Sequence, residues 1–282
     1  MEEETIIISA LSTLTPNKLK DLTHTILSLS DHWRRRLSAV ISSPILFSLT
    51  LHHLHSLSLP NKTLLIARHL LFSLQLLTQC FPRSPPPHSS TYQIKRRDHD
   101  AVLLLLLLCE VHQQDPEALS AAPQAKWPAV LGKHFCASAL SLSGIVGGAY
   151  EGAVLLPYVE MVTRCRRFVN AMGGGGVRGG EKEGRDVAAA VVAVVGLPSV
   201  DGAGADQCCV ICKEEMGGGR DVCELPCKHL FHWLCILPWL KKRNTCPCCR
   251  FRLPTDDVFG EIERLWDALV KTSGGGSFDG ES

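Results

Sequence analysis

Eight cysteine and histidine side chains lie close together late in the chain, at spacings that suit metal binding. Two Cys-x-x-Cys pairs enclose a Cys-x-His-x-x-His-x-x-Cys core. Zinc prefers tetrahedral sets of thiolate and imidazole ligands, so eight ligands make two closed sites. Because a closed site leaves no position for water, we expect these metals to hold the fold and not to hydrolyse a substrate. The predicted ligands are Cys209, Cys212, Cys227, His229, His232, Cys235, Cys246 and Cys249.

The segment that carries these ligands is short for an independent fold. About 40 residues bury too little apolar surface to be stable alone, and structural zinc contributes on the order of 10–16 kcal/mol to such peptides. We therefore expect the segment to unfold without zinc. The spacing alone leaves two pairings open, because the ligands can serve the two ions either as consecutive sets of four or as interleaved sets.

Three further cysteines lie in or beside the same segment. Cys208 and Cys248 do not give the two-residue gap that lets two thiolates reach one ion, and Cys223 lies in a loop before Cys227. We expect all three to be bystanders. The alternative for Cys223 is a nucleophile that carries a thioester, but no base for it is apparent in the sequence.

The ligand segment resembles a RING finger of the two-histidine type. The resemblance is carried by the run from His232 to Leu240 (HWLCILPWL) and by the run from Cys246 to Arg250 (CPCCR). It implies a small α+β cross-brace domain with two Zn²⁺ ions and interleaved ligands. One implied site consists of Cys209, Cys212, His232 and Cys235, and the other consists of Cys227, His229, Cys246 and Cys249.

The resemblance also implies an activity, that of a RING-type E3 ubiquitin transferase. Such a protein binds a ubiquitin-conjugating enzyme charged with ubiquitin and promotes transfer to lysines of a protein substrate, which is then degraded by the proteasome. It supplies no catalytic residue of its own, because it acts by orienting the thioester. The implied groove for the conjugating enzyme comprises Ile211, Trp239 and Pro247, and Arg250 is implied to position ubiquitin.

A narrower resemblance links the chain to the plant ABI-interacting (AIP) type of RING ubiquitin ligase. It is carried by the tail from Leu253 to Trp266 and by two upstream segments, from Lys18 to Ile26 and from Pro157 to Val162. This group implies a transcription factor in abscisic acid signalling as the substrate, with the helical region as the recruiter.

The alternative function is a zinc-stabilised module that binds protein or nucleic acid without transferase activity. Between Ala205 and Arg252 there are eight Lys or Arg against five Asp or Glu, a net charge of +3. This charge is too small for strong phosphate binding, so we do not expect a nucleic-acid partner.

The first half of the chain has the apolar spacing of amphipathic helices. Leucine, isoleucine, tryptophan and valine recur at three- and four-residue steps over 15–40, in a second segment that starts at Ser43-Pro44, and over 61–79. Such helices with short connections predict a helical bundle. The basic run from Arg34 to Arg36 is short, and we expect it to form a solvated helix face. The leucine run at 101–109 is too short to cross a membrane, which needs about 20 residues, so a buried helix is expected.

These patterns divide the chain into four parts. We expect a mainly α region for substrate or partner binding over 1–172, with a proline-rich linker near 82–90 and a helix that opens at Pro157. A flexible Gly-rich linker with a short helix follows over 173–204, and the finger occupies 205–254. The last part, 255–282, is expected to form an amphipathic helix and a disordered tail. The apolar face of that helix should pack on the finger or pair with a second copy, giving a homodimer.

The composition favours the cytoplasm or the nucleus. The net charge is +1 and the chain starts with Met-Glu-Glu-Glu, whereas a secretory signal starts with a basic region. Of the 13 cysteines, those outside the six predicted zinc ligands are scattered without the framework of a disulfide-rich protein. We therefore expect neither a signal peptide nor a membrane partner.

Overall fold

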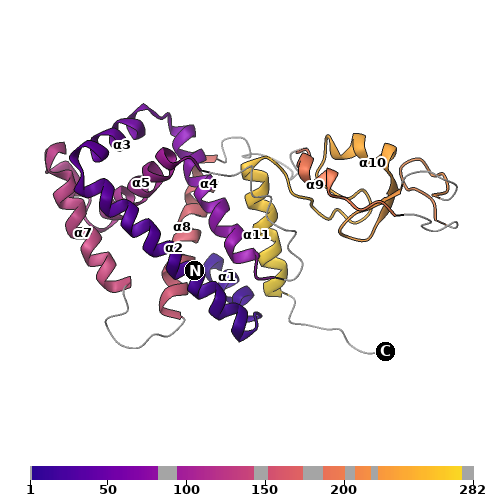
Figure 1. Cartoon of the computed structure of the whole chain (residues 1–282), viewed down its shortest axis with the longest axis horizontal. Coiled ribbons are helices and arrows are strands. Elements are labelled where there is room, and N and C mark those ends of the chain that lie inside the picture. The colour runs from indigo at the N-terminus through magenta and orange to yellow at the C-terminus, as the bar shows by residue number, and fades with distance from the viewer. Residues whose placement is uncertain are drawn as a thin grey trace. The chain divides into compact units, whose positions relative to one another are not determined.

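The computed structural model describes residues 2–81, 94–142, 152–173, 187–200, 207–216 and 222–274 (Figure 1). They fall into two compact units. The described residues up to 173, together with those from Asp267 onward, form a helical unit, and the described residues from 187 to Trp266 form a finger unit. The expected fold class is confirmed: the chain is mainly helical, with a small α+β finger late in the sequence.

The helical unit consists of α-helices of very different lengths and one short 3₁₀ helix. They are α1 (Glu2–Ser12), α2 (Pro16–Ser42), α3 (Pro44–Ser56), α4 (Leu59–Thr78), α5 (Arg96–Gln114), α6 (Glu117–Ser120), η1 (Gln124–Lys126), α7 (Trp127–Leu142) and α8 (Gly152–Gly173). The finger unit contains α9 (Val191–Val195), β1 (Val222–Glu224), β2 (Leu230–His232), α10 (Trp233–Leu240) and the first part of α11 (Val258–Gly274).

The three helices predicted from periodicity are present as α2, α3 and α4. Each begins next to a proline, which lacks an amide hydrogen and therefore fits the first turn of a helix. The Ser43 side chain accepts a hydrogen bond from the Leu46 amide at 3.4 Å, as expected of an N-cap. Thr15 precedes α2 in extended conformation, but its side chain makes no capping hydrogen bond.

Helix α4 packs mainly against α8. Its leucines at 70, 71, 74 and 77 are essentially inaccessible to solvent. The leucine run of α5 is likewise largely buried, as predicted, since Val102, Leu103, Leu104 and Leu107 lie in the core. Among the described residues no single helix is long and apolar enough to cross a membrane. Helices α2 and α3 pass that test only as a pair, and they are bent by 101° at their junction.

Ion pairs connect α1 to α8. The Glu3 carboxylate accepts a 2.9 Å hydrogen bond from Nε of Arg166 and lies 3.4 Å from Nε of Arg167. Glu4 accepts from Nη2 of Arg167 at 3.3 Å. Since Ile7 and Ala10 on the same helix are fully buried, α1 is an integral part of the helical unit.

One expectation about the basic run of α2 is wrong. Arg34 and Arg35 are on the surface side of the helix, but Arg36 donates through Nε to Asp100 on α5 at 3.1 Å and through Nη2 to the second carboxylate oxygen. Both side chains are largely buried. A guanidinium can be buried when a carboxylate accepts two of its hydrogen bonds, and the sequence of α2 alone does not reveal that distant partner.

The part of the chain with weak periodicity also forms helices. Residues 113–142 contain α6, η1 and α7, and the indole nitrogen of Trp127 donates to the carbonyls of Leu119 and Ala122, each at 3.1 Å. Helix α8 begins at Gly152, so the prediction that Pro157 opens it is wrong: the proline lies inside the helix. The proline-rich segment 82–90, the Gly-rich stretch 174–186 and the tail 275–282 lie outside the described residues.

A buried histidine lies under the aromatic side chains of the helical unit. The rings of His69 on α4 and Trp33 on α2 are 4.8 Å apart, and Nε2 of His69 has no hydrogen-bond partner among the described residues. Burial, together with a smaller effect of the nearby His99, lowers the pKa of His69 to about 4. The imidazole is therefore neutral in the folded unit.

This histidine predicts a loss of stability in acid. The unfolded chain takes up a proton near pH 6.5, whereas the folded chain does so only near pH 4, so the helical unit loses on the order of 3 kcal/mol as the pH falls from 7 to 4. A His69→Phe variant should lose most of that dependence. Hydrogen exchange of the α4 amides at the two pH values measures it. The exposed His55→Phe serves as the control, and an equal pH dependence in wild type and His69→Phe would contradict the assignment.

Candidate zinc centres

The finger is built around a two-stranded antiparallel sheet and one short helix. Strand β1 pairs with β2 so that Val222 lies opposite His232 and Cys223 lies opposite Phe231. Phe231 is fully buried beneath the sheet, and His232 ends β2 at the point where α10 begins. Three loops bring the remaining predicted ligands toward this frame.

Each of these loops contains a residue with left-handed backbone conformation. Lys213 (φ 63°) follows Cys212, Lys228 (φ 68°) lies between Cys227 and His229, and Arg250 (φ 59°) follows Cys249. Side chains other than glycine seldom adopt this conformation, so it marks a tight turn imposed by the surroundings. Each of these turns lies beside two of the predicted zinc ligands.

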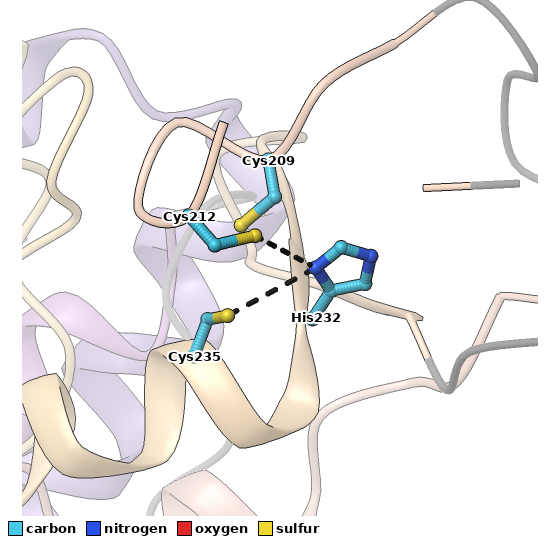
Figure 2. A group of neighbouring side chains, drawn as sticks. All are labelled: Cys209, Cys212, His232 and Cys235. Atoms are coloured by element: carbon cyan, nitrogen blue, oxygen red, sulfur yellow. Dashed lines mark hydrogen bonds between the residues drawn. The ribbon is translucent and has the colours of Figure 1, made fainter. Parts of the chain in front are cut away.

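The first cluster joins the start of the finger to its sheet and helix (Figure 2). Nδ1 of His232 lies 3.4 Å from the sulfur of Cys212 and 3.9 Å from that of Cys235. The Cys209 sulfur completes the group, and all four ligand atoms lie within 4.8 Å of one another. Figure 2 shows the three sulfurs facing the same edge of the imidazole ring.

The second cluster joins the middle of the finger to its end. Nδ1 of His229 lies 3.4 Å from the sulfur of Cys227, and the sulfurs of Cys246 and Cys249 complete a group within the same 4.8 Å limit. The structure thus brings together the predicted ligands in two interleaved sets of four. Cys208, Cys223 and Cys248 belong to neither set.

Both clusters fit zinc in composition and in size. Each offers three thiolates and one imidazole nitrogen, a common structural zinc set. With zinc about 2.3 Å from sulfur and about 2.1 Å from nitrogen, the ligand atoms of a tetrahedron are roughly 3.6 Å apart. The distances of 3.4 and 3.9 Å around His232 match this value. The finger can therefore bind two zinc ions.

The cysteines differ in the protonation state that their surroundings favour. Burial raises the pKa of the Cys209 thiol, but backbone donors at Cys212, His232 and Ile211 lower it to about 7 overall. This position favours the thiolate that binds metal. Burial instead raises the pKa of Cys223 to about 11, and its side chain is fully enclosed in β1. Because its side chain is inaccessible to solvent, Cys223 is a core residue and not a poised nucleophile.

The residues predicted to contact the conjugating enzyme lie on loops and on α10. Ile211 lies between the ligands Cys212 and Cys209 and is 39% exposed. The half-buried Trp239 lies in the last turn of α10, and its indole nitrogen donates to the Thr245 carbonyl at 2.7 Å. Pro247 is half-buried, and Arg250 is exposed.

A segment that the ligand spacing does not reveal also belongs to the finger. We call residues 188–200 the strap. The Ala189 amide donates to the carbonyl of Leu240, at the end of α10, at 2.9 Å, and the Ala190 amide donates to Pro254 at 2.8 Å. Ala189 and Leu197 are part of the finger's buried core. The apolar run that ends at Leu197-Pro198 predicts a short helix, but it does not indicate that this segment packs on the finger.

The strap also closes the sheet and the end of the finger. The Val200 amide donates to the Val222 carbonyl at 2.8 Å, and the Thr255 hydroxyl donates to the Ala188 carbonyl at 2.8 Å. The Thr255 amide in turn donates to Glu261 on α11 at 3.2 Å. The packed finger therefore extends from 188 to the start of α11.

Fold and site together define a cross-brace zinc finger of the RING type. A family model for the Ring finger domain matches residues 207–250. E3 ubiquitin-protein ligase SGR9, amyloplastic, of Arabidopsis thaliana is 54% identical over 287 residues, which cover 97% of this chain and 98% of that protein.

Other relatives match the finger region only. E3 ubiquitin-protein ligase RNF181 of Mus musculus is 51% identical over 24% of this chain and 43% of its own length. E3 ubiquitin-protein ligase AIP2 of Arabidopsis thaliana is 56% identical over 19% of this chain and 17% of its own length. Because one relative matches along nearly the whole chain, the chain belongs to the RING-type E3 ubiquitin-protein ligases. Its reaction requires a conjugating enzyme and a protein substrate.

The zinc content should distinguish ligands from neighbours of the same kind. Cys248 and Cys249 are adjacent and both exposed, but only Cys249 belongs to a cluster. We expect about two zinc ions per chain in the wild type and in Cys248→Ser, and about one in Cys249→Ser, because a tetrahedral site that lacks a thiolate loses affinity. Elemental analysis of the purified, dialysed chains measures this. Equal zinc content in the two variants would contradict the ligand assignment.

The strap should contribute to the stability of the finger. Leu197 is 8% exposed within the finger core, so Leu197→Ala should cost about 2–4 kcal/mol and speed the release of zinc to a colorimetric chelator. Val195 on the same strap is 76% exposed, and Val195→Ala should change stability by less than about 0.5 kcal/mol. Equal release rates for the two variants would show that the strap is not part of the folded finger.

Proposed function

We propose that the finger binds a ubiquitin-charged conjugating enzyme through Ile211, Trp239 and Pro247, and that Arg250 positions the ubiquitin. The observation that carries this assignment is that an apolar side chain on the first loop and a tryptophan on α10 remain accessible beside the two clusters. Ile211 is 39% exposed although it adjoins two buried or half-buried ligands. An aliphatic side chain and an aromatic one with partial exposure are typical of the residues that dominate binding energy at interfaces.

Two contacts hold the Trp239 side chain in place. Its indole nitrogen is held by the Thr245 carbonyl, and the guanidinium of Arg243 lies 5.3 Å from the ring centroid. The strap also donates a hydrogen bond to the carbonyl of Leu240, the residue after Trp239. Hydrogen bonds thus hold both the Trp239 side chain and the backbone next to it. Because the Trp239 indole is already held in place, a partner that binds it loses little free energy in ordering this side chain.

Arg250 is suited to contact two partners at the same time. Its backbone is left-handed beside the ligand Cys249, and its side chain is exposed. A guanidinium carries five donors in a planar fork and can bind carbonyl groups of two proteins together. We propose that it bridges ubiquitin and the conjugating enzyme.

The contribution of the finger to catalysis is then orientation. A charged conjugating enzyme samples many positions of its ubiquitin, and holding the thioester ready for a lysine amine removes that orientational entropy from the reaction. The finger needs no nucleophile of its own, which agrees with the enclosed, protonated state of Cys223. We propose that the two clusters serve this role by binding zinc with the interleaved ligands described above.

The helical unit is the proposed recruiter of the protein substrate. It is a separately packed unit with its own core, and it is also covered by the relative that matches along nearly the whole chain. We further propose a transcription factor in abscisic acid signalling as the substrate, and its proteasomal degradation as the outcome. The support is the resemblance to the AIP type, and AIP2 itself matches over 19% of this chain.

The burial of α11 leaves little apolar surface for the predicted homodimer. Its apolar residues Ile262, Leu265, Trp266 and Leu269 are already buried within one chain. A second copy would have to displace these contacts. The side chains nearest the start of the helix also have partners within the chain. The Asp257 carboxylate accepts a hydrogen bond from the Gly260 amide at 2.7 Å, and both carboxylate oxygens of Glu261 accept from Arg264.

For the location of the protein we propose the cytoplasm or the nucleus. The support is the reducing compartment implied by the scattered cysteines. The name of the relative from Arabidopsis thaliana includes the word amyloplastic. Fractionation of cells that express a tagged chain tests the proposal, since recovery in the protease-protected interior of plastids would contradict it.

The proposed groove predicts the effect of single substitutions on lysine discharge. We expect the full chain to accelerate the loss of ubiquitin from a charged conjugating enzyme to free lysine. Ile211→Ala and Arg250→Ala should each slow this reaction at least about tenfold, because each removes an anchor contact. Val210 is adjacent and even more exposed, at 61%, so Val210→Ala should react as the wild type does. Single-turnover gels measure the rates.

The control for this experiment is zinc content, which should be equal in all four chains. If the wild type accelerates the reaction and both variants accelerate it equally well, the groove must lie elsewhere on the finger. If the folded, zinc-loaded wild type accelerates no conjugating enzyme in a representative panel, the chain is a binding module without transferase activity.

A further inference from the structure

Helix α3 carries large apolar side chains on its exposed face. The helix packs against α2 and α5 (Figure 1). The side chains that it buries share one side of the helix: Phe47, Thr50, Leu51 and Leu54. On the other side Ile45 is 73% exposed, Leu49 is 60% exposed and Leu46 is 40% exposed. We call these three residues the α3 patch. They are three or four positions apart or adjacent, so their side chains are neighbours, and a contiguous apolar surface of this kind marks a site of interaction.

The chain around the α3 patch contains no acidic residue. Residues 32–97 include nine Lys or Arg and no Asp or Glu, whereas the rest of the chain has 20 Lys or Arg against 28 Asp or Glu. With histidine counted as neutral, the net charge is +9 in this segment and −8 elsewhere, although that of the whole chain is only +1. Such a segregation of charge favours an anionic partner for the basic segment.

Basic side chains lie beside the α3 patch in the structure. His53, one turn after Leu49, contacts Asp98 on α5 through Nε2 at 2.9 Å. Asp100 is bound to Arg36, so both carboxylates at this end of α5 already have partners. The residues just before Asp98 are exposed, and none of them forms an ion pair within the described part of the chain: Lys95, Arg96 and Arg97. The start of α5 therefore presents positive charge next to an apolar helix face.

The shape of the α3 patch favours a lipid bilayer over a protein or a nucleic acid. The side chain of Ile45 stands out from the surface, whereas a groove for a peptide encloses the side chains that it binds. A helix at a bilayer surface inserts such protruding side chains roughly 5–10 Å among the lipids and needs no complementary shape. Anionic headgroups attract Lys and Arg beside the helix. The phosphates of a nucleic acid would also attract these residues, but they offer no apolar contact to the patch.

We propose that the helical unit binds the surface of an anionic phospholipid bilayer. The α3 patch enters the headgroup region, and Lys95, Arg96 and Arg97 contact the lipid phosphates. The expectation of no membrane partner rests on the length of the apolar segments and on the start of the chain, and neither property bears on a helix that lies on a bilayer. The inference goes beyond the proposed function, because it places ubiquitin transfer at a membrane surface.

Flotation of the full-length chain with lipid vesicles tests the proposal. The chain should float with vesicles of phosphatidylcholine that contain about 30% phosphatidylglycerol, and not with phosphatidylcholine alone. Ile45→Ser should weaken binding about tenfold, because it removes an apolar side chain that the bilayer buries. Ile8 on α1 is 46% exposed and follows an acidic first turn, so Ile8→Ser is the matched control and should bind as the wild type does.

Removal of charge provides a second test that leaves the α3 patch intact. Arg96→Gln and Arg97→Gln should each weaken binding about fivefold, and salt should weaken the binding of the wild type. Lys20 is exposed near the opposite end of α2, far along that helix from its junction with α3, and Lys20→Gln should bind as the wild type does. Circular dichroism of each variant verifies folding.

Several results would overturn the membrane proposal. These are no flotation of the wild type with anionic vesicles, equal binding by Ile45→Ser and Ile8→Ser, or no effect of either arginine substitution. Binding to polyglutamate without binding to vesicles would assign the basic residues to an acidic protein. Light scattering tests the remaining occupant, since a wild-type dimer that Ile45→Ser converts to a monomer would show that the patch contacts a second copy of the chain.

Discussion

Each of the two clusters in the finger connects parts of the chain that are far apart in sequence. Cys209 and Cys212 meet His232 and Cys235, while Cys227 and His229, which lie between them in sequence, meet Cys246 and Cys249. Neither cluster can form without fixing the path of the chain through the other. The apolar core between them is small, with Phe231, Ile236 and Leu225 as its fully buried centre. Metal binding therefore contributes folding free energy that this core cannot provide.

The same constraint positions the surface that meets the conjugating enzyme. The ligand Cys235 and the proposed contact Trp239 lie on one short helix, and Ile211 and Pro247 lie inside the two Cys-x-x-Cys turns. Loss of a ligand would therefore displace these contacts even though they bind no metal. The strap holds the C-terminal end of α10 by its hydrogen bond to Leu240, and Thr255 connects the strap to Glu261 on α11. The packed part of the finger is therefore longer than the segment that contains its ligands.

The sequence predicts those parts of the molecule whose chemistry depends on residue type and local spacing. The ligands were recognisable because few other patterns place cysteine and histidine at such intervals, and α2, α3 and α4 because an apolar stripe has a fixed period. The pairing of ligands came from the family resemblance. The strap was missed because alanine and valine carry no spacing signal, and the Arg36–Asp100 pair because its two members are 64 residues apart.

The most direct test of this account replaces zinc with NMR-active cadmium and correlates each metal signal with the cysteine and histidine protons coupled to it. We predict that Cys209, Cys212, His232 and Cys235 share one metal signal, and that Cys227, His229, Cys246 and Cys249 share the other. Correlation of Cys227 and His229 with the metal bound by Cys209 and Cys212 would show consecutive pairing. It would contradict the interleaved arrangement on which the placement of Trp239, Ile211 and Arg250 depends.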